Sequence, residues 1–226
     1  MECSPIAFFA FNRPYHTMQS LNSLIKNKEA KDTDLYVFID GHRKFSEVHL
    51  VDNVEKVIKS FCGKFNSLTI NRSNYNLTGG TNQKRGITEV LSKHETVIVL
   101  EDDIYVSENF LAYMNNSLHI YKKENKVFHI NGYSYPTKLE SEEECFFLRI
   151  MLCWGWATWK DRWNKFIEDP LSCDPYYLKN TFTKNMIKGF DLNLKKSLFW
   201  AQVLDNANGK LNNTWDIFWY GYIFIN

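Results

Sequence analysis

The stretch VIVLEDD, residues 97–103, decides the fold that the sequence predicts. Its four apolar residues are typical of a strand buried on both faces, as the strands of a parallel sheet are. Three carboxylates, Glu101, Asp102 and Asp103, follow at the point where this strand ends. Because ligands of open parallel sheets bind beyond the carboxyl ends of the strands, the stretch predicts an α/β sheet with an acidic ligand-binding edge.

The same alternation of an apolar run and a helical segment recurs along the chain. Apolar runs predict further strands at residues 5–11, 35–39, 68–70 and 127–130. Apolar residues at helical spacing predict helices at 18–25, 46–61, 84–91 and 109–121, with Thr17 and Ser46 as N-caps. The alternation indicates a mostly parallel central sheet with helices on both faces. No strand precedes a GxGxxG or P-loop motif, which disfavours a dinucleotide fold or a P-loop enzyme.

Composition excludes several classes of protein. The 226 residues hold 27 Lys and Arg against 26 Asp and Glu, so a net charge of +1 provides no field for nucleic acid. A hydrophobic content of 44% excludes a disordered chain. The five cysteines lack metal-ligand spacing and indicate reduced thiols. With no signal peptide and no apolar run of membrane-spanning length, we expect a protein of the cytoplasm or the inner face of the membrane, with peripheral membrane contact at most.

The two parts of the chain differ in aromatic content. Phe, Tyr and Trp make up 16% of the residues, and all seven Trp follow Cys153. The clearest soft boundary is the polar, acidic stretch at residues 137–144. We therefore expect one domain made of two parts, residues 1–136 and residues 137–226.

Glu101, Asp102 and Asp103 favour a metal site. Three adjacent carboxylates repel one another unless water or a cation offsets their charge. Hard divalent ions such as Mg2+ and Mn2+ take oxygen ligands, often only one or two from the protein and the rest from water and substrate phosphates. The triplet therefore fits a metal held against a diphosphate. The alternative is a solvated acidic turn before the next helix, and the triplet alone leaves both interpretations open.

Seven stretches resemble, in consistent order, GT-A-fold glycosyltransferases that use nucleotide sugars. The resemblance is to the N-acetylglucosaminyltransferase I type and to bacterial polysaccharide-cluster transferases. These stretches are FNRP at 11–14, FIDGHR at 38–43, NYNLTGGTNQKRGI at 74–87, VIVLEDDIYVSENFLAYM at 97–114, NGYSYP at 131–136, WGWATWKDRW at 154–163 and NTWDIFWY at 213–220. The triplet with its preceding strand, a DXD-like EDD motif, is the most specific of them.

The resemblance implies roles for the residues that follow the first, second and fourth strands. It places the metal, Mn2+ or Mg2+, on Asp103. It places Glu101 and Asp102 on the sugar or ribose side of the donor. Asp40 would face the uracil or ribose, and Arg13 would lie near the nucleotide. For Asp40, an ordinary turn with Gly41 is the alternative interpretation, and for Arg13 an exposed loop residue.

Further residues are implied along the donor and acceptor sides. The segment from Gly79 to Arg85 would line the donor pocket, which adds Gly80, Lys84 and Arg85 to the candidate set. In inverting relatives the general base is an aspartate after a tryptophan, which corresponds to Asp216 after Trp215. Asp205 is the reserve candidate for the base, although a turn residue fits it equally well.

The tryptophans after Cys153 have two interpretations. Trp156, Trp159 and Trp163 stand at helical spacing, which is typical of a buried helical stripe. Aromatic rings also stack on sugars, and a glycine lets the backbone approach a ligand. We expect Trp154, Gly155 and Trp156 to line the pocket. Trp159 and Trp163 would belong to the core, and Trp200, Trp215 and Trp219 would pack around the segment that carries the base.

The function that the resemblance implies is metal-dependent, inverting transfer of a hexosyl or N-acetylhexosaminyl group. The donor would be a nucleotide sugar, with a UDP-sugar favoured. The acceptor would be a hydroxyl of a glycan or lipid-linked oligosaccharide in bacterial surface polysaccharide synthesis. Residues 1–136 would bind the donor, and residues 137–226 would form the acceptor side. Because the chain ends at residues 223–226, before a strand and tail that the family has, we expect a shortened C-terminus.

Two other classes of function stay open. A sugar-phosphate nucleotidyltransferase also uses acids and a metal, but it needs a Gly-rich, Arg-containing loop after the first strand, where this chain has Asn12-Arg13-Pro14. A non-catalytic carbohydrate-binding module would account for the tryptophans and would have no use for a nucleotide.

Overall fold

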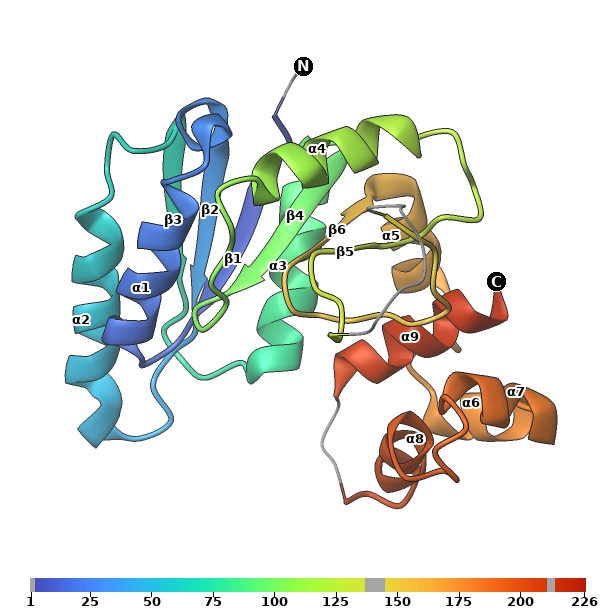
Figure 1. Ribbon diagram of the computed structural model, residues 1–226. Coiled ribbons are helices and arrows are strands. Elements are labelled where there is room, and N and C mark those ends of the chain that lie inside the picture. The colour runs from blue at the N-terminus through green and yellow to red at the C-terminus, as the bar shows by residue number, and fades with distance from the viewer. Residues whose placement is uncertain (1–2, 137–144, 211–213) are drawn as a thin grey trace. The chain divides into compact units, whose positions relative to one another are not determined.

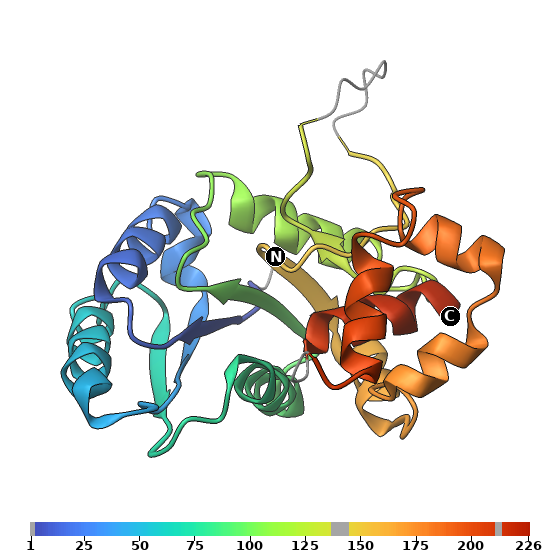
Figure 2. The ribbon, with the colours of Figure 1, turned by 90° about the horizontal axis from the view of Figure 1, so that it is seen from below.

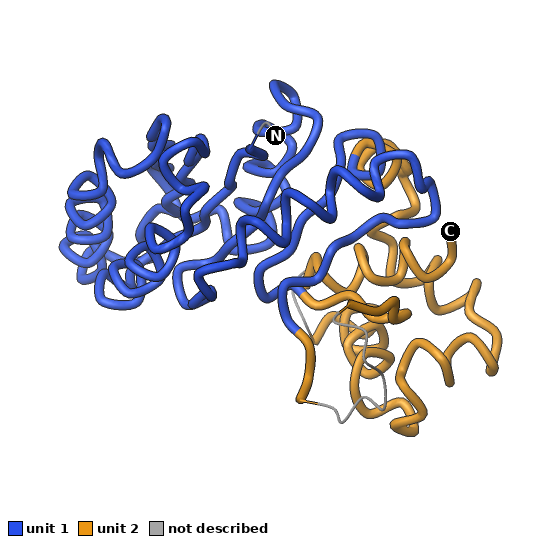
Figure 3. Tube along the Cα trace, turned by 45° about the horizontal axis from the view of Figure 1, so that its top comes forward, with its two compact units in different colours: residues 1–133, 153–163 blue, residues 134–152, 164–226 orange. Residues whose placement is uncertain are grey.

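The computed structural model describes residues 3–136, 145–210 and 214–226. The chain forms two compact units, one of residues 1–133 and 153–163, the other of residues 134–152 and 164–226 (Figure 3). The soft boundary expected at 137–144 lies outside the described residues. Residues 153–163 belong to the first unit, although they follow the division expected at residue 136.

The first unit is built on one sheet of six strands. They are β1 (Ile6–Ala10), β2 (Asp34–Ile39), β3 (Ser67–Arg72), β4 (Thr96–Glu101), β5 (Ile130–Asn131) and β6 (Trp156–Trp159), in the order β3-β2-β1-β4-β6-β5. The four strands β1 to β4 pair in parallel, whereas β6 is antiparallel to both β4 and β5. The predicted fold class, a mostly parallel α/β sheet, is confirmed.

Helices cover both faces of this sheet. They are α1 (Pro14–Leu24), α2 (Val48–Lys59), α3 (Gly79–Lys93) and α4 (Phe110–Ile120), with short 3-10 helices η1 (Lys28–Asp32) and η2 (Phe45–Glu47). One core joins the sheet to α1, α2 and α4, and its buried side chains include Phe8, Leu21, Val54 and Met114. The opposite face carries α3 (Figures 1 and 2). On this helix, Gly86 lies against the rings of Phe9 and Phe38.

Several predicted boundaries were wrong. The first helix begins at Pro14, which suits the first helical position because proline has no N–H to donate. Thr17 therefore lies inside the helix, and its hydroxyl donates to the carbonyl of Arg13 at 2.9 Å. The second helix begins at Val48 after η2 without a side-chain cap from Ser46. The third begins at Gly79, five residues before the predicted start, directly after Thr78, which has a φ of 68°.

Trp156 and Trp159 lie on a strand, so the helical interpretation of these two residues was wrong. β6 pairs with β4, with Trp156 opposite Val99 and Trp159 opposite Thr96. Aromatic and β-branched residues favour a strand that packs against a sheet. The indole N–H of Trp159 donates to the carbonyl of Leu118 at 3.1 Å. Trp163 lies on the next helix, α5 (Lys160–Glu168), and both Trp159 and Trp163 are buried core residues as expected.

The second unit is helical and packs around aromatic side chains. Its helices are α6 (Pro175–Thr181), α7 (Lys184–Phe190), α8 (Phe199–Ala207) and α9 (Trp215–Ile225), besides the last part of α5. Phe190 stacks on Tyr220 at 4.3 Å between ring centroids, and Phe182 lies 5.3 Å from Trp200. Trp200, Trp215 and Trp219 are all buried, which confirms their packing role. None of the helices in the described ranges is both long and apolar enough to span a bilayer.

Candidate functional site

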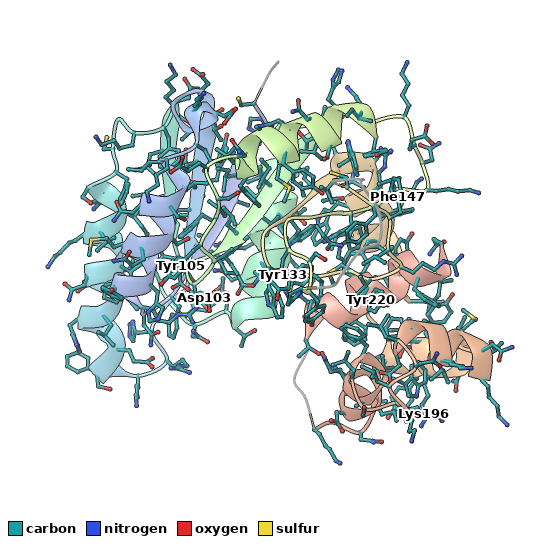
Figure 4. The ribbon with its side chains drawn as sticks, in the orientation of Figure 1. Asp103, Tyr105, Tyr133, Phe147, Lys196 and Tyr220 are labelled. Atoms are coloured by element: carbon teal, nitrogen blue, oxygen red, sulfur yellow. The ribbon has the colours of Figure 1, made fainter. Side chains whose placement is uncertain are left out.

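The candidate site lies where β1, β2 and β4 end. These strands are neighbours and parallel, so their carboxyl ends meet at one edge of the sheet. β1 leads into residues 11–13, β2 into Asp40, and β4 into the acidic triplet. The sheet thus brings together side chains that are up to 90 residues apart in the sequence. Figure 4 shows Asp103 and Tyr105 near this edge of the first unit.

Arg13 links the ends of β1 and β4 through two carboxylates. One guanidinium nitrogen, Nη1, donates to Oδ2 of Asp103 at 2.9 Å, and the other, Nη2, pairs with Oδ1 of Asp102. The backbone N–H of Phe11 donates to the remaining oxygen of Asp102 at 3.4 Å. Asp102 is only 1% exposed, and burial raises the pKa of its carboxyl, although Arg13 offsets part of this shift. Arg13 therefore holds the acidic triplet in place. It also lines the cavity that is described below.

Asp40 organises the loop between β3 and α3. It is buried, and its carboxylate accepts hydrogen bonds from the backbone N–H groups of Gly41 at 2.9 Å and Leu77 at 2.8 Å. Its second oxygen accepts from the side-chain amide of Asn76 at 3.0 Å. Burial raises the pKa of Asp40, and these hydrogen bonds oppose that shift. Gly41 has no left-handed φ; a Cβ atom there would overlap the backbone of Tyr75, so close approach of the two loops requires glycine.

A cavity of about 380 Å3 opens between these groups, and we call it the nucleotide-side cavity. Four of the predicted residues line it: Arg13, Asp40, Glu101 and Asp102. Its volume lies within the range of small-molecule sites, roughly 300–1,000 Å3. Arg13 and Arg43 supply positive charge beside the carboxylates, so the cavity can accept a ligand that carries both polar hydroxyls and negative charge.

Several residues that line this cavity were predicted only as members of a segment, without a role of their own. Asn82 and Gln83, on the first turns of α3, are buried polar side chains. Asn76 and Arg43 line the cavity from neighbouring loops. A polar residue on a helix is ordinarily solvent-exposed, so the helical spacing gave no signal for Asn82 and Gln83. Their only signal was membership of the segment from Gly79 to Arg85, which the resemblance placed at the donor pocket. Of that segment, Gly79, Asn82 and Gln83 line the cavity, whereas Gly80, Lys84 and Arg85 are not among its lining residues.

Arg43 is held at the cavity by Glu47. Its backbone N–H donates to Oε2 of Glu47 at 3.0 Å, and its Nε donates to Oε1 at 3.2 Å. The guanidinium lies over the ring of Phe11, 5.0 Å from the ring centroid. The side-chain amide of Asn12 donates to Glu47 at 3.3 Å. Arg43 lowers the pKa of Glu47 to about 2, so the loops after β1 and β2 are joined through an ionised carboxylate.

A second cavity of about 350 Å3, the aromatic cavity, is lined by Asp103 and by the aromatic side chains of Tyr105, Tyr133 and Trp154. The three residues predicted to line a pocket together do not do so. Trp154 is 43% exposed and lines this cavity, but Trp156 is fully buried and stacks on His129 at 4.8 Å. Gly155 lies between them with φ of +72°, a conformation that glycine adopts without strain.

Asp103 is the residue best placed to hold a metal ion. Its side chain is 43% exposed, in contrast to the buried Asp102. Within the described ranges, no three His, Cys, Asp or Glu side chains gather to form a complete metal cage. Mg2+ and Mn2+ do not require one, because substrate phosphates and water commonly complete their coordination. An exposed carboxylate beside the nucleotide-side cavity therefore fits an ion that is shared with a diphosphate.

Asp205 and Asp216 belong to the second unit and line neither cavity. Asp205 lies on α8, with Nζ of Lys210 at 3.8 Å from its carboxylate. Asp216 lies in the first turn of α9 and is half-buried. The assignment of the general base to Asp216, with Asp205 in reserve, stays a prediction.

Comparison with known proteins identifies the fold. A scan against protein-family models and a search of curated proteins each find no match. Among solved structures, the mannosyltransferase PcManGT from Pyrobaculum calidifontis, in complex with GDP-Man and Mn2+, matches with a TM-score of 0.52 and 10% identity, over 97% of this chain and 69% of that chain. The fold is GT-A.

Two further structures match this GT-A chain more weakly. S. aureus TarS in complex with UDP has a TM-score of 0.49 and 13% identity over 77% of this chain and 54% of its own. The 4-diphosphocytidyl-2C-methyl-D-erythritolsynthase from Anaerococcus prevotii has a TM-score of 0.43 and 13% identity over 74% of this chain and 77% of its own. The chain spans about half the length of the TarS chains that it matches. Likeness at such identities concerns the fold alone.

Removing Arg13 is expected to destabilise the first unit. In Arg13→Ala, the buried carboxylate of Asp102 loses its counter-charge. A fully buried broken pair costs about 3–5 kcal/mol, and we expect about 1–3 kcal/mol here because Arg13 is partly exposed. Urea unfolding measures the difference. Arg72→Ala, which breaks ion pairs with Asp52 and Glu55, two carboxylates that are both more exposed than Asp102, is the control and should cost less than about 1 kcal/mol. Equal losses in both variants would contradict the bridging role of Arg13.

Glu47 is expected to make stability depend on acidic pH. Because its pKa is lowered to about 2 in the folded protein, its contribution is present above the ordinary Glu value of about 4.3 and is lost as the pH falls toward 2. Urea midpoints should therefore decline less steeply between about pH 5 and pH 2.5 in Glu47→Gln than in the wild type. Glu108→Gln, at an exposed loop position, is the control. Parallel curves for wild type and Glu47→Gln would refute the assignment.

Proposed function

We propose that the chain is a glycosyltransferase that moves a hexosyl or N-acetylhexosaminyl group from a nucleoside-diphosphate donor to a hydroxyl acceptor. The observation that supports it most is the pair of buried acids, Asp40 and Asp102, around one cavity at the strand ends of a GT-A sheet. The acceptor is a glycan or a lipid-linked oligosaccharide in surface polysaccharide synthesis. As part of this proposal, the chain acts in the cytoplasm or at the inner face of the membrane.

The nucleoside diphosphate would bind in the nucleotide-side cavity. Asp40 faces the uracil or ribose of a UDP-sugar, and Glu101 and Asp102 face the ribose or sugar. The guanidinium groups of Arg13 and Arg43 stand at the same cavity, where they would offset the charge of the phosphates. Asn76, Asn82 and Gln83 supply amide groups suited to hydroxyls and to a base edge. Gly80, Lys84 and Arg85 would act from α3 without lining the cavity themselves.

A divalent ion, Mn2+ or Mg2+, would be held by Asp103. When bound there, the ion supplies positive charge against the diphosphate that departs. The chain itself contributes Arg13, which already pairs with Asp102 and Asp103 and is a fixed cation beside the leaving group. Preorganised positive charge at the position where negative charge develops lowers the barrier without reorganisation during the reaction.

Asp216 is the proposed general base. The acceptor oxygen attacks the anomeric carbon, its proton passes to the Asp216 carboxylate, and the bond from that carbon to the diphosphate oxygen breaks. A single displacement of this kind inverts the configuration of the anomeric carbon. Asp205 is the reserve for this role.

Ligand-induced stabilisation tests the donor and metal assignments. A ligand that binds only the folded chain raises its unfolding temperature. UDP and UDP-sugars should therefore stabilise the wild type, more so with Mn2+ present. In Asp103→Asn, the Mn2+-dependent part of the shift should be lost, while a shift with UDP alone remains. Asp52→Asn, an exposed acid on α2, is the matched control. Unchanged Mn2+ dependence in Asp103→Asn would contradict the metal assignment.

The same assay, followed by product analysis, separates the competing functions. A carbohydrate-binding module has no use for the nucleotide, so the absence of any shift with nucleoside diphosphates would favour it. Release of free nucleoside diphosphate during turnover indicates glycosyl transfer, whereas release of pyrophosphate indicates a nucleotidyltransferase.

Asp216→Asn is expected to lower turnover while sparing the donor site. Loss of a general base typically costs a factor of about 100 to 10,000 in rate. Donor affinity, measured by calorimetry with a UDP-sugar and Mn2+, should stay within about twofold of the wild type, because Asp216 binds no part of the donor in this proposal. Asp205→Asn is the companion variant. A loss of donor affinity in Asp216→Asn, or full turnover, would move the base elsewhere.

A further inference from the structure

The aromatic cavity is separate from the nucleotide-side cavity, and the acidic triplet stands between them. Glu101 and Asp102 line the nucleotide-side cavity, whereas the next residue, Asp103, lines the aromatic cavity. The two sites therefore share one turn of the backbone after β4. A ligand in the aromatic cavity would be adjacent to the carboxylate that we assign to the metal and diphosphate.

Aromatic rings form much of the wall of this cavity. The rings of Tyr133 and Trp154 meet edge to face, 4.9 Å apart between centroids. Both side chains are exposed, as is that of Tyr105 on the loop after β4. Figure 4 shows Tyr105 and Tyr133 on the same edge of the first unit as Asp103. Of the seven Trp residues, all within the described ranges, Trp154 alone is exposed, and each of the others is at most 5% exposed.

The backbone beneath these rings is fixed by glycine packing. The N–H of Gly132 donates to the carbonyl of Gly155 at 2.7 Å. A Cβ atom at Gly132 would come within 2.5 Å of that carbonyl oxygen and 2.6 Å of the ring of Phe110. Gly132 precedes Tyr133, and Gly155 follows Trp154, so this contact sets the positions of both rings. The cavity is thus preformed, which reduces the entropic cost of binding.

The lining suits a ligand with apolar faces and polar edges. Ile104, Val106 and Phe110 are apolar, and they alternate with the carboxylate of Asp103 and the hydroxyls of Tyr105 and Ser107. Tyr and Trp offer large, stiff rings with a polar group at one end. Among the described residues, the one charged member of the lining is the acidic Asp103, which disfavours a phosphate. A pyranose ring has the required form, because its C–H groups lie on its faces and its hydroxyls lie around its rim.

We propose that the aromatic cavity binds a pyranose ring stacked on Trp154 and Tyr133, with Asp103 at its edge. The inference rests on the proposed function, since it places a sugar beside the acid turn of a glycosyltransferase. The same chemistry has two sources, the sugar of the donor and the terminal sugar of the acceptor. Either source would place a sugar next to Asp103, the carboxylate assigned to the divalent ion beside the leaving diphosphate.

The test uses calorimetry with two sets of probes in the presence of Mn2+. The first set compares the affinities of UDP and GDP with those of four nucleotide sugars: UDP-glucose, UDP-galactose, UDP-N-acetylglucosamine and GDP-mannose. The other set is the methyl glycosides of the same sugars. Trp154→Ala should weaken binding of the sugar-bearing probes by about tenfold, while UDP or GDP alone stays within about twofold. Trp154→Phe should retain most of the affinity, because it keeps a ring.

The two sets separate the sources of the sugar. An effect of Trp154→Ala on the nucleotide sugars assigns the cavity to the donor sugar, and an effect on the methyl glycosides assigns it to the acceptor. Tyr133→Ala should act in the same direction, and Tyr15→Ala, which removes an exposed ring from α1 outside both cavities, should change neither set. Equal affinities of the sugar-bearing probes for wild type and Trp154→Ala would overturn the proposal. It would also be overturned if the nucleotide sugars bound no more tightly than UDP or GDP and the methyl glycosides did not bind. Failure of the proposed function is distinguishable, because UDP and GDP alone would then not bind to the wild type.

Discussion

The bridge from Arg13 to Asp102 and Asp103 is the interaction on which the site depends. It joins the ends of two strands that are neighbours in the sheet but about 90 residues apart in the sequence. A buried carboxylate such as Asp102 needs a partner, since an isolated charge away from water costs several kcal/mol. Arg13 meets that need and in doing so fixes the turn that carries Asp103.

The rest of the edge repeats this use of a buried acid as an anchor. Asp40 holds the loop before α3 through hydrogen bonds from Gly41, Leu77 and Asn76. Glu47 holds Arg43 beside Phe11. Each acid also accepts a hydrogen bond from a loop that follows another strand: the loop after β1 for Asp102 and Glu47, and the loop after β3 for Asp40. The loops are therefore ordered before a ligand arrives, and the two cavities that flank the triplet are preformed parts of the fold.

The sequence predicted the sheet and its acidic edge well, because both follow from local patterns. Continuous apolar runs such as VIVL at 97–100 occur where strands are buried on both faces, and parallel strands direct their following residues to one edge. The spacing of Trp156, Trp159 and Trp163 fits a helix, and the helical prediction was wrong for the first two of them. Pairing with β4 makes Trp156–Trp159 a strand. No local pattern marked Asn82 and Gln83 individually within the segment expected at the donor pocket, since only the tertiary fold buries those polar faces. The two-cavity arrangement likewise depends on β6 and β5 returning beside β4, a long-range pairing that no local pattern contains.

The central claim is that a nucleoside diphosphate and a divalent ion meet at the carboxyl ends of β1, β2 and β4. A crystal structure of the chain grown with UDP and Mn2+ tests it most directly. The account predicts the nucleoside in the cavity lined by Asp40 and Arg13, with the ion bound by the Asp103 carboxylate and the diphosphate oxygens. A nucleotide bound elsewhere, or an ion that bridges the diphosphate without contacting Asp103, would contradict it.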